Sequence, residues 1–153
     1  MSANVNVNLV ESEAAFKALL AANTFVIADF YADWCGPCKA IAPLYAKLAT
    51  ENAVAGHLAF AKINVDNVPE VAKEYSVSAM PSFLFFSSGE RASVNIAPRK
   101  PGATIESEDA DAAAKNVQNL IKGADPRALS AAAARLGEIA KATAAAAAAE
   151  AAA

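Results

Sequence analysis

The pattern of apolar and polar residues over the first part of the chain predicts a strand, a helix and a second strand. Polar and apolar side chains alternate over residues 4–10 (NVNVNLV), which is typical of a half-exposed strand. A short amphipathic helix is predicted over residues 12–22, with Ser12 as its N-cap. A nearly continuous apolar run over residues 24–32 (TFVIADFYA) suits a central strand that is buried on both faces.

The same criteria predict further helices and strands downstream. Helical spacing over residues 38–52 predicts a helix, and Pro43 inside it predicts a kink. A strand over residues 58–66, a short helix over residues 68–76 and a strand over residues 81–90 follow. This alternation predicts an α/β fold in which helices cover both faces of a central sheet.

Residues 91–115 break the alternation. They contain two prolines, a glycine and several acids, and they have no long apolar run. We predict a long exposed loop here, and loops of this length are uncommon unless they have a function or are disordered.

The sequence allows two interpretations of the stretch before the last helix. Residues 116–122 (NVQNLIK) read as a short strand that a turn at Gly123 ends. Alternatively, residues 107–122 form a helix that ends at the same glycine. The last helix is predicted to begin near Pro126 and to fray after about Lys141, because the alanines beyond that point offer nothing large to bury.

Length and composition limit the classes of protein to which this chain can belong. A chain of 153 residues suits one ordinary domain, and its 56% hydrophobic content is inflated by alanines near the C-terminus. No run approaches the roughly 20 apolar residues of a membrane-spanning helix. The net charge of -3 supplies no basic patch, so we expect neither a nucleic acid nor a membrane as a partner. The first residues lack the pattern of a secretory signal, so we expect a cytoplasmic location.

The only two cysteines, Cys35 and Cys38, are separated by Gly36 and Pro37, which set the geometry of a tight turn. If a helix begins near Cys35, its dipole and free amides stabilise a thiolate there. We predict that Cys35 is the better exposed thiol and attacks a target disulfide. Cys38, carried into the first turn of the helix, resolves the mixed disulfide.

Asp29 stands inside the apolar strand that precedes the cysteines. Burial without a strong cation nearby in sequence predicts a raised pKa for this carboxyl. A carboxyl that is neutral or nearly so can accept the proton of Cys38 when that thiol attacks. A purely structural, salt-bridged acid is the competing interpretation.

A zinc site is the alternative use of two cysteines at this spacing. Zinc would need two further ligands, and His57 is the chain's only histidine. We therefore expect no metal, and we interpret His57 as a loop residue.

Residues 29–39 (DFYADWCGPCK) resemble the active-site motif of the thioredoxin family. The order of the predicted elements also resembles the thioredoxin fold, an α/β fold with a central mixed sheet flanked by helices on both faces. The similarity runs from about residue 5 to residue 89 and resumes at residues 120–129 (LIKGADPRAL). It favours the strand interpretation of the stretch before Gly123.

The resemblance implies roles for residues outside the two thiols. Trp34 covers the active site, and Lys62 is the cation near the buried acid, with a possible tuning role. Met80 and Pro81 correspond to the family's cis-proline loop, which lies against the cysteines and pairs with an extended substrate. Gly123 forms the third part of this substrate groove.

Two features depart from the family. An insertion at residues 91–115 interrupts what should be a tight hairpin, and an alanine-rich tail exceeds the usual last helix. We therefore divide the chain into a thioredoxin-like domain at residues 1–141, which includes the insertion, and a C-terminal extension at residues 142–153.

A second alignment is possible around the insertion. In it, the last strand covers residues 93–97, and Ala97 takes the place of Gly123 in the groove. The assignment of the two cysteines is the same in either alignment.

The resemblance implies a cytoplasmic, monomeric protein-disulfide reductase with no bound cofactor. Its partners would be disulfide-containing client proteins and a thioredoxin reductase, a flavoprotein that passes electrons from NADPH to the Cys35–Cys38 disulfide. A binding module of the same fold, which docks a client with little turnover, is the alternative. An isomerase of an oxidising compartment would need a targeting signal, which the sequence does not display.

Overall fold

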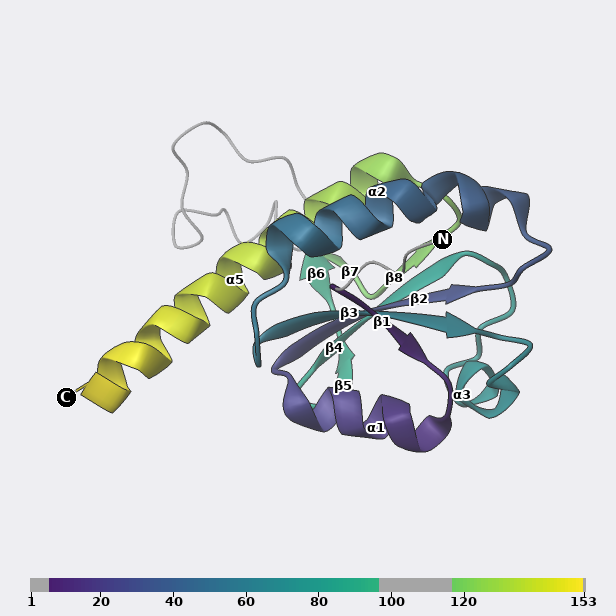
Figure 1. Cartoon of the computed structure of the whole chain (residues 1–153). Helices are drawn as coiled ribbons and strands as arrows, with labels where there is room; N and C mark the ends of the chain where they lie inside the picture. Colours follow the sequence, from purple (N-terminus) through teal and green to yellow (C-terminus); the bar gives the residue numbers. More distant parts are fainter. Residues whose placement is uncertain (1–5, 97–116, 153) are drawn as a thin grey trace.

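A mixed sheet lies at the centre of the chain, as the resemblance implies (Figure 1). The computed structural model describes residues 6–96 and 117–152. The strands of this sheet are β1 (Val7–Val10), β2 (Phe25–Tyr31), β3 (Leu58–Asn64), β4 (Ser82–Ser87), β5 (Glu90–Ala92) and β8 (Leu120–Lys122). They lie in the order β1, β3, β2, β4 and β5, and β8 also pairs with β4. The first three are parallel to one another, and β4 is antiparallel to its neighbours.

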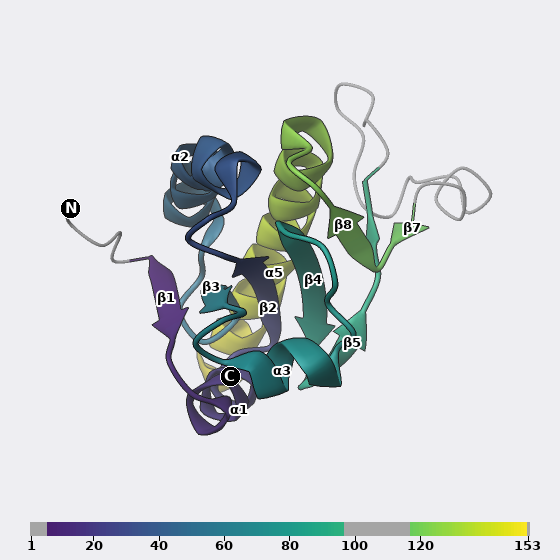
Figure 2. The ribbon, with the colours of Figure 1, turned by 90° about the vertical axis from the view of Figure 1, so that its right-hand side faces the viewer.

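Helices cover both faces of the sheet (Figures 1 and 2). They are α1 (Glu13–Ala22), α2 (Gly36–Asn52), α3 (Pro69–Glu74) and α5 (Pro126–Ala152). One core lies between the sheet and α2 with α5, and a second core lies between the sheet and α1 with α3. The predicted α/β architecture is therefore confirmed for the described residues.

The alternation of side chains along β2 explains why its sequence is apolar on both faces, with Asp29 as the exception. Ile27 faces α2 and α5, whereas Val26, Ala28 and Phe30 face α1 and α3. All four side chains are at most 1% exposed. Since successive side chains of a strand point to opposite faces, a strand covered on both sides favours apolar residues at successive positions.

The predicted starts of α1 and α3 agree with the structure, whereas α2 begins at Gly36, two residues before the predicted range of 38–52. The Oγ of Ser12 accepts a hydrogen bond from the amide of Ala15 at 3.0 Å, so Ser12 is the N-cap of α1. Pro69 begins α3, where its missing amide donor costs nothing. Pro43 lies inside α2, and the kink that it suggests stays a prediction.

The predicted loop at residues 91–115 is wrong at its start. After a turn at Gly89, the chain returns along β4 as β5, and Val94–Asn95 then form β6. The edge of β4 leaves backbone donors and acceptors that need partners, and β5 supplies them. Val94 is only 3% exposed, which an exposed loop would not allow. Residues 97–115 lie outside the described part of the chain.

The strand interpretation of residues 116–122 is confirmed where the structure describes them. Val117–Gln118 form β7, which pairs with β6 in a small separate sheet, and β8 pairs with Ser82–Leu84 of β4. The rival helix over residues 107–122 is therefore wrong in this region. The alternative last strand at residues 93–97 is also wrong, because β6 pairs with β7 and β8 takes the place beside β4.

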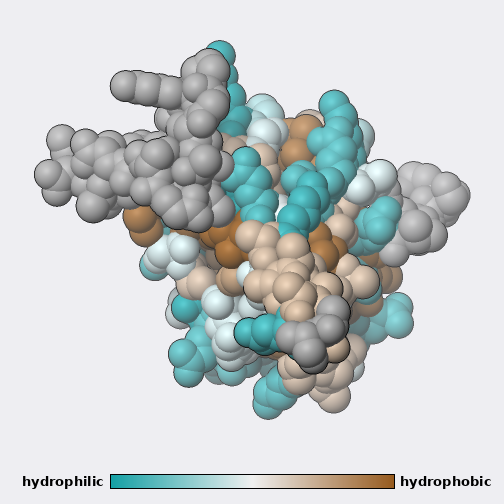
Figure 3. Space-filling view, turned by 90° about the vertical axis from the view of Figure 1, so that its left-hand side faces the viewer, coloured by the Kyte–Doolittle hydropathy of each residue, from teal (hydrophilic) through white to brown (hydrophobic). Residues whose placement is uncertain are grey.

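The last helix begins as predicted but ends later. Asp125 caps α5, since its Oδ1 accepts a hydrogen bond from the amide of Ala128 at 3.1 Å. The expected fraying after Lys141 is not seen, and α5 continues to Ala152 beyond the body of the sheet (Figure 1). Alanine has the highest helix propensity, and extending a helix that is already anchored by packing avoids the cost of nucleation. The side chains near its end are exposed, and the alanine surface is visible in Figure 3.

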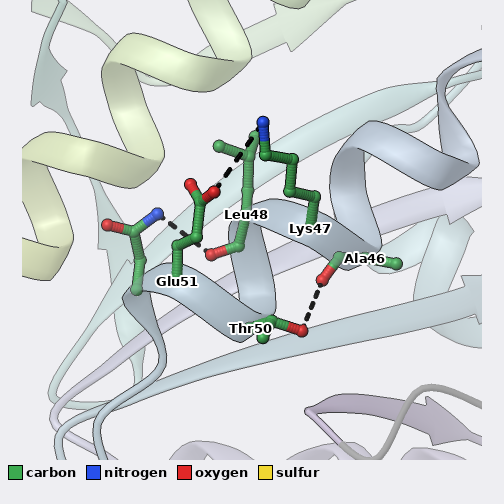
Figure 4. A network of polar contacts seen from close by, with 6 residues as sticks. Ala46, Lys47, Leu48, Thr50 and Glu51 are labelled. Atoms are coloured by element: carbon green, nitrogen blue, oxygen red, sulfur yellow. Dashed lines mark hydrogen bonds and ion pairs between the residues drawn. The ribbon is translucent and has the colours of Figure 1, made fainter.

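The helices α2 and α5 lie close together at Gly137. A Cβ atom at this position would lie 2.6 Å from the Oδ1 of Asn52 and 3.0 Å from its Cβ. The side chain of Asn52 donates a hydrogen bond to the carbonyl of Leu48 (3.0 Å). Figure 4 shows two further contacts along the last turns of α2, the hydrogen bond from Thr50 to Ala46 (3.1 Å) and the ion pair of Lys47 with Glu51 (3.8 Å).

We predict that Gly137→Ala lowers the free energy of unfolding by about 1 to 2 kcal/mol. Overpacking costs about 1 to 3 kcal/mol, whereas the gain in helix propensity is at most about 1 kcal/mol. Urea denaturation checks this. In an Asn52→Ala background, which removes the two outer clashing atoms, the same change should cost less. An equal loss in both backgrounds, or a gain in the wild type, would contradict close packing at Gly137.

Candidate active site

The two cysteines lie where β2 ends and α2 begins. Cys35 is the N-cap of α2, and its Sγ accepts a hydrogen bond from the amide of Cys38 at 3.2 Å. Pro37 sits in the first turn, where a helix tolerates a missing amide donor. A disulfide joins Cys35 to Cys38. The tight turn and the helix start therefore place the first sulfur at the positive end of the α2 dipole, as predicted.

The predicted exposure of Cys35 is wrong. Cys35 is 5% exposed and Cys38 is 6% exposed, so neither thiol is the better exposed one in this disulfide state. Both pack with Ala32, and Tyr31 and Met80 close the cluster from its sides. The Sγ of Cys35 lies 3.5 Å from the carbonyl oxygen of Met80. The loop at Met80, which is distant in sequence, thus covers the sulfur of Cys35. The prediction of exposure considered only the start of the helix and did not take this loop into account.

The peptide bond between Met80 and Pro81 is cis, as the resemblance implies. A hydrogen bond of 2.6 Å from the Oγ of Ser82 to the carbonyl of Ala79 joins the two residues that flank this loop. On its other side, the amide of Gly123 donates to the carbonyl of Pro81 at 2.7 Å. Gly123 has φ +91°, a conformation that favours glycine. The structure therefore brings Gly123 beside the cis-proline loop.

Asp29 lies at the centre of β2 and is 1% exposed. Its Oδ1 is buried and has no hydrogen-bond partner among the described residues. Burial raises the pKa of Asp29 to about 7, and the positive charge of Lys62 opposes this rise. Lys62 pairs with Asp29 across β2 and β3, and its Nζ lies 4.4 Å from the centre of the Tyr31 ring. The predicted raised pKa is thus present, and the predicted cation is its neighbour.

Trp34 is 69% exposed, beside the buried thiols. Its Nε1 donates a hydrogen bond to the Oδ2 of Asp66 at 3.0 Å, so the ring has a fixed orientation on the surface. The amide of Asp66 in turn donates to the Oδ1 of Asn64 at 2.9 Å. A large exposed aromatic ring held in this way is suited to contact with another protein.

Three residues of the site were not singled out from the sequence. Asp66 orients Trp34, Tyr31 receives the cation of Lys62, and Tyr45 anchors α2 on the sheet. The hydroxyl of Tyr45 lies 2.9 Å from the carbonyl of Ile27 and 2.7 Å from that of Ala61. The sequence signals the role of Tyr45 only by placing a tyrosine at an apolar helix position. The roles of Asp66 and Tyr31 depend on pairing between strands, which the sequence does not show.

A metal site has no support in the described part of the chain. It contains no group of three or more His, Cys, Asp or Glu residues that could hold a metal ion. His57 precedes β3 at the sheet edge where β2 begins, whereas the cysteines follow the other end of β2. The length of β2, roughly 20 Å at 3.3 Å per residue, separates them. Nor do residues 6–96 and 117–152 include a helix with the length and apolar character to cross a membrane.

A disulfide between residues three positions apart closes a very small loop, so it contributes little to the stability of the fold. Its role is therefore thiol-disulfide exchange and not stabilisation. The fold and this site define a thiol-disulfide oxidoreductase. The sequence model of thioredoxin matches residues 7–108, and the chain belongs to the thioredoxin family.

Individual relatives agree with this assignment over most of their length. A thioredoxin of Neurospora crassa is 47% identical over 138 residues, which cover 90% of this chain and 92% of the relative. A thioredoxin-like protein of Fusarium culmorum is 43% identical over 135 residues, covering 88% and 94%. The crystal structure of Malassezia sympodialis thioredoxin superimposes with a TM-score of 0.61 at 30% identity, covering 86% of this chain and 90% of that one.

These comparisons decide between the two functional hypotheses. The chain is a protein-disulfide reductase with a redox-active Cys35–Cys38 pair, and a binding module with little turnover is not favoured.

We predict that Asp29→Asn stabilises the oxidised protein increasingly as the pH rises. Because the pKa of Asp29 is raised from 3.8 to about 7, the folded protein keeps a proton that the unfolded chain has already lost. The wild type therefore loses up to about 4 kcal/mol of unfolding free energy across this pH range, at about 1.4 kcal/mol for each pKa unit, and the variant does not.

Urea denaturation at a series of pH values measures this difference between the two proteins. Asp33→Asn, which removes an exposed acid of the same segment, is the matched control and should show no such trend. A stability difference between Asp29→Asn and wild type that is equal at pH values below 3.8 and above 7 would show that Asp29 is not a buried, protonated acid.

Proposed function

We propose that Cys35 is the nucleophile and Cys38 the resolving thiol of this reductase. In the reduced protein, the Cys35 thiolate attacks one sulfur of a client disulfide, that bond breaks, and the other client sulfur leaves as a thiolate. Cys38 then attacks the Sγ of Cys35, which restores the Cys35–Cys38 disulfide and releases the second client thiol. The observation that carries this order is the N-cap position of Cys35, where the amide of Cys38 donates to its sulfur.

We further propose that Asp29 accepts the proton of Cys38 during the resolving step. The attacking species is the thiolate, so the thiol proton must leave before the second exchange. A carboxyl with a pKa of about 7 is close to half ionised at neutral pH and can both take up and release this proton. Lys62, the cross-strand neighbour of Asp29, would then tune the pKa of the acceptor.

The client is proposed to bind in a groove between Trp34, the Met80–Pro81 loop and Gly123. The carbonyl of Met80 next to the Cys35 sulfur supports this, because an extended peptide paired with the loop would bring its own sulfur to the same place. The low exposure of Cys35 adds a further argument. A cysteine that is 5% exposed is reached only by a disulfide whose flanking chain fits the groove around it.

The oxidised protein is proposed to be recharged by a flavoprotein thioredoxin reductase that uses NADPH, with no cofactor bound to this chain. One relative supports such a pairing. A protein of Mycobacterium leprae named bifunctional thioredoxin reductase/thioredoxin is 39% identical over 88 residues, which cover 57% of this chain and 19% of the relative. We also propose that the protein acts as a monomer in the cytoplasm. The chain has no cysteines besides Cys35 and Cys38, so its folding requires no oxidising compartment.

We expect Cys38→Ser to accumulate a mixed disulfide with a protein substrate, because the attack of Cys35 proceeds and its resolution does not. Cys35→Ser should form no such adduct, and it should reduce insulin no faster than dithiothreitol alone. Non-reducing electrophoresis and mass spectrometry of the adduct measure this. Adduct formation through Cys38 in the Cys35→Ser variant would reverse the assigned roles.

The proton transfer predicts a pH-dependent defect in Asp29→Asn. Below the pKa of about 7, the wild-type carboxyl is mostly protonated, so the two proteins should resolve a Cys35-bound peptide at similar rates. Above it, the wild type has an ionised acceptor and should be faster by about tenfold or more. Single-turnover release of the peptide measures this rate. A ratio of rates that does not change with pH would contradict the role of Asp29 as proton acceptor.

A further inference from the structure

The edge of the sheet beside β4 is made of two segments that are far apart in the sequence. Ala92, the last residue of β5, pairs with Phe85. Leu120, the first residue of β8, pairs with Leu84, the next residue along β4. Figure 2 shows β5 and β8 on the same edge of β4. The two segments thus act as one strand with a seam between Ala92 and Leu120, and the chain between them leaves and returns at that seam.

The register across the seam decides which side chains share a face. Side chains of a strand alternate, so continuity from β5 to β8 places Arg91, Leu120 and Lys122 on one face. Ala92 and Ile121 then lie on the other, and Ile121 is buried in the core under α2 and α5. Leu120 packs on the opposite core, under α1 and α3. Two cations that are widely separated in the sequence therefore stand on either side of Leu120.

A small cavity of about 50 Å³ lies over this face, and we call it the seam pocket. It is lined by Leu84, Leu120 and residues 75–78, in the turn after α3. Arg91 and Lys122 line it from the composite strand, and Ser82 lines it from β4. Its lining therefore combines two cationic residues with Tyr75 and three serines, and it includes no carboxylate.

The cations of the seam pocket have no acidic partner within the described residues. Neither Arg91 nor Lys122 belongs to the ion pairs of Lys17 with Glu13 and of Lys47 with Glu51. One Nη of Arg91 donates to the carbonyl of Asn119 at 2.9 Å, which holds the guanidinium across the seam and leaves its other N–H groups available.

Acids near the seam pocket stand outside its lining. Glu74 and Glu13 act on the hydroxyl of Tyr75 and raise its pKa after the larger effect of burial, whereas Arg91 and Lys17 lower it. The balance of charge inside the seam pocket is thus positive.

We propose that the seam pocket binds one small tetrahedral oxyanion, of the size of phosphate or sulfate, between Arg91 and Lys122. A guanidinium and an ammonium supply charge-assisted hydrogen bonds to such an ion, and the hydroxyls of Ser76 and Ser78 can donate to its remaining oxygens. The hydroxyl of Ser82 cannot, because it donates to the carbonyl of Ala79. A volume of about 50 Å³ suits a single phosphate-sized group. Lys122 pairs with Ser82, directly after Pro81, so a bound ion would lie next to the cis-proline loop. This site is separate from the thiols and does not depend on their chemistry.

Titration of the oxidised full-length protein with inorganic phosphate tests this proposal, with chloride used to hold the ionic strength constant. We expect saturable shifts of the backbone amide resonances of residues 76–78 and Lys122. Lys122→Gln should weaken the binding by about tenfold or more, which corresponds to about 1.4 kcal/mol. Ser78→Ala should weaken it less. Lys141→Gln makes the same change of charge on α5, on the other side of the sheet, and should bind phosphate like the wild type.

Arg91→Gln should also weaken binding. Because it removes the hydrogen bond to Asn119 as well, its effect is not specific to the ion, and Lys122→Gln is therefore the decisive variant. The proposal is overturned if the shifts do not saturate or if chloride alone produces them. It is also overturned if Lys122→Gln binds phosphate as tightly as the wild type does, or if Lys141→Gln weakens binding to the same extent.

Discussion

The pairing of β2 with both of its neighbours is the constraint on which the site depends. Parallel pairing with β3 sets Asp29 beside Lys62, and antiparallel pairing with β4 sets Phe30 beside Ser82. The second register brings Pro81, the residue before β4, to the end of β2 from which the cysteines follow. A slip of one residue in either pairing would turn the side chains of the slipped strand to the other face and dismantle this arrangement.

The carboxyl of Asp29 shows that the core of this protein is not optimised for stability. A buried carboxyl with an unpartnered oxygen is costly, and the protein lowers that cost by keeping a proton on it up to about pH 7. The same burial produces a proton acceptor near neutral pH, which ordinary exposed acids are not. Lys62 limits the rise because it is held half-buried between Asp29 and the ring of Tyr31.

The edge of the sheet formed by β5 and β8, where the chain departs from a simple hairpin, also contacts the cis-proline loop of the site. The composite edge strand ends at Lys122, and the next residue, Gly123, donates to the carbonyl of Pro81. Pairing of β6 with β7 and the bond from Arg91 to Asn119 hold the seam together at the base of the insertion. The position of Gly123 beside the cis-proline loop therefore depends on pairing between segments that are far apart in the sequence.

Local patterns in the sequence determined most of the elements up to β4, the cap at Ser12, the turn between the cysteines and the burial of Asp29, because propensity, capping and periodicity act between near neighbours. The cis-proline loop could be expected from the family motif alone. Only the tertiary structure decided that Cys35 is covered, that α5 extends to Ala152, and that β8 rather than residues 93–97 completes the sheet. These outcomes depend on registers and contacts between distant segments, which no local pattern encodes.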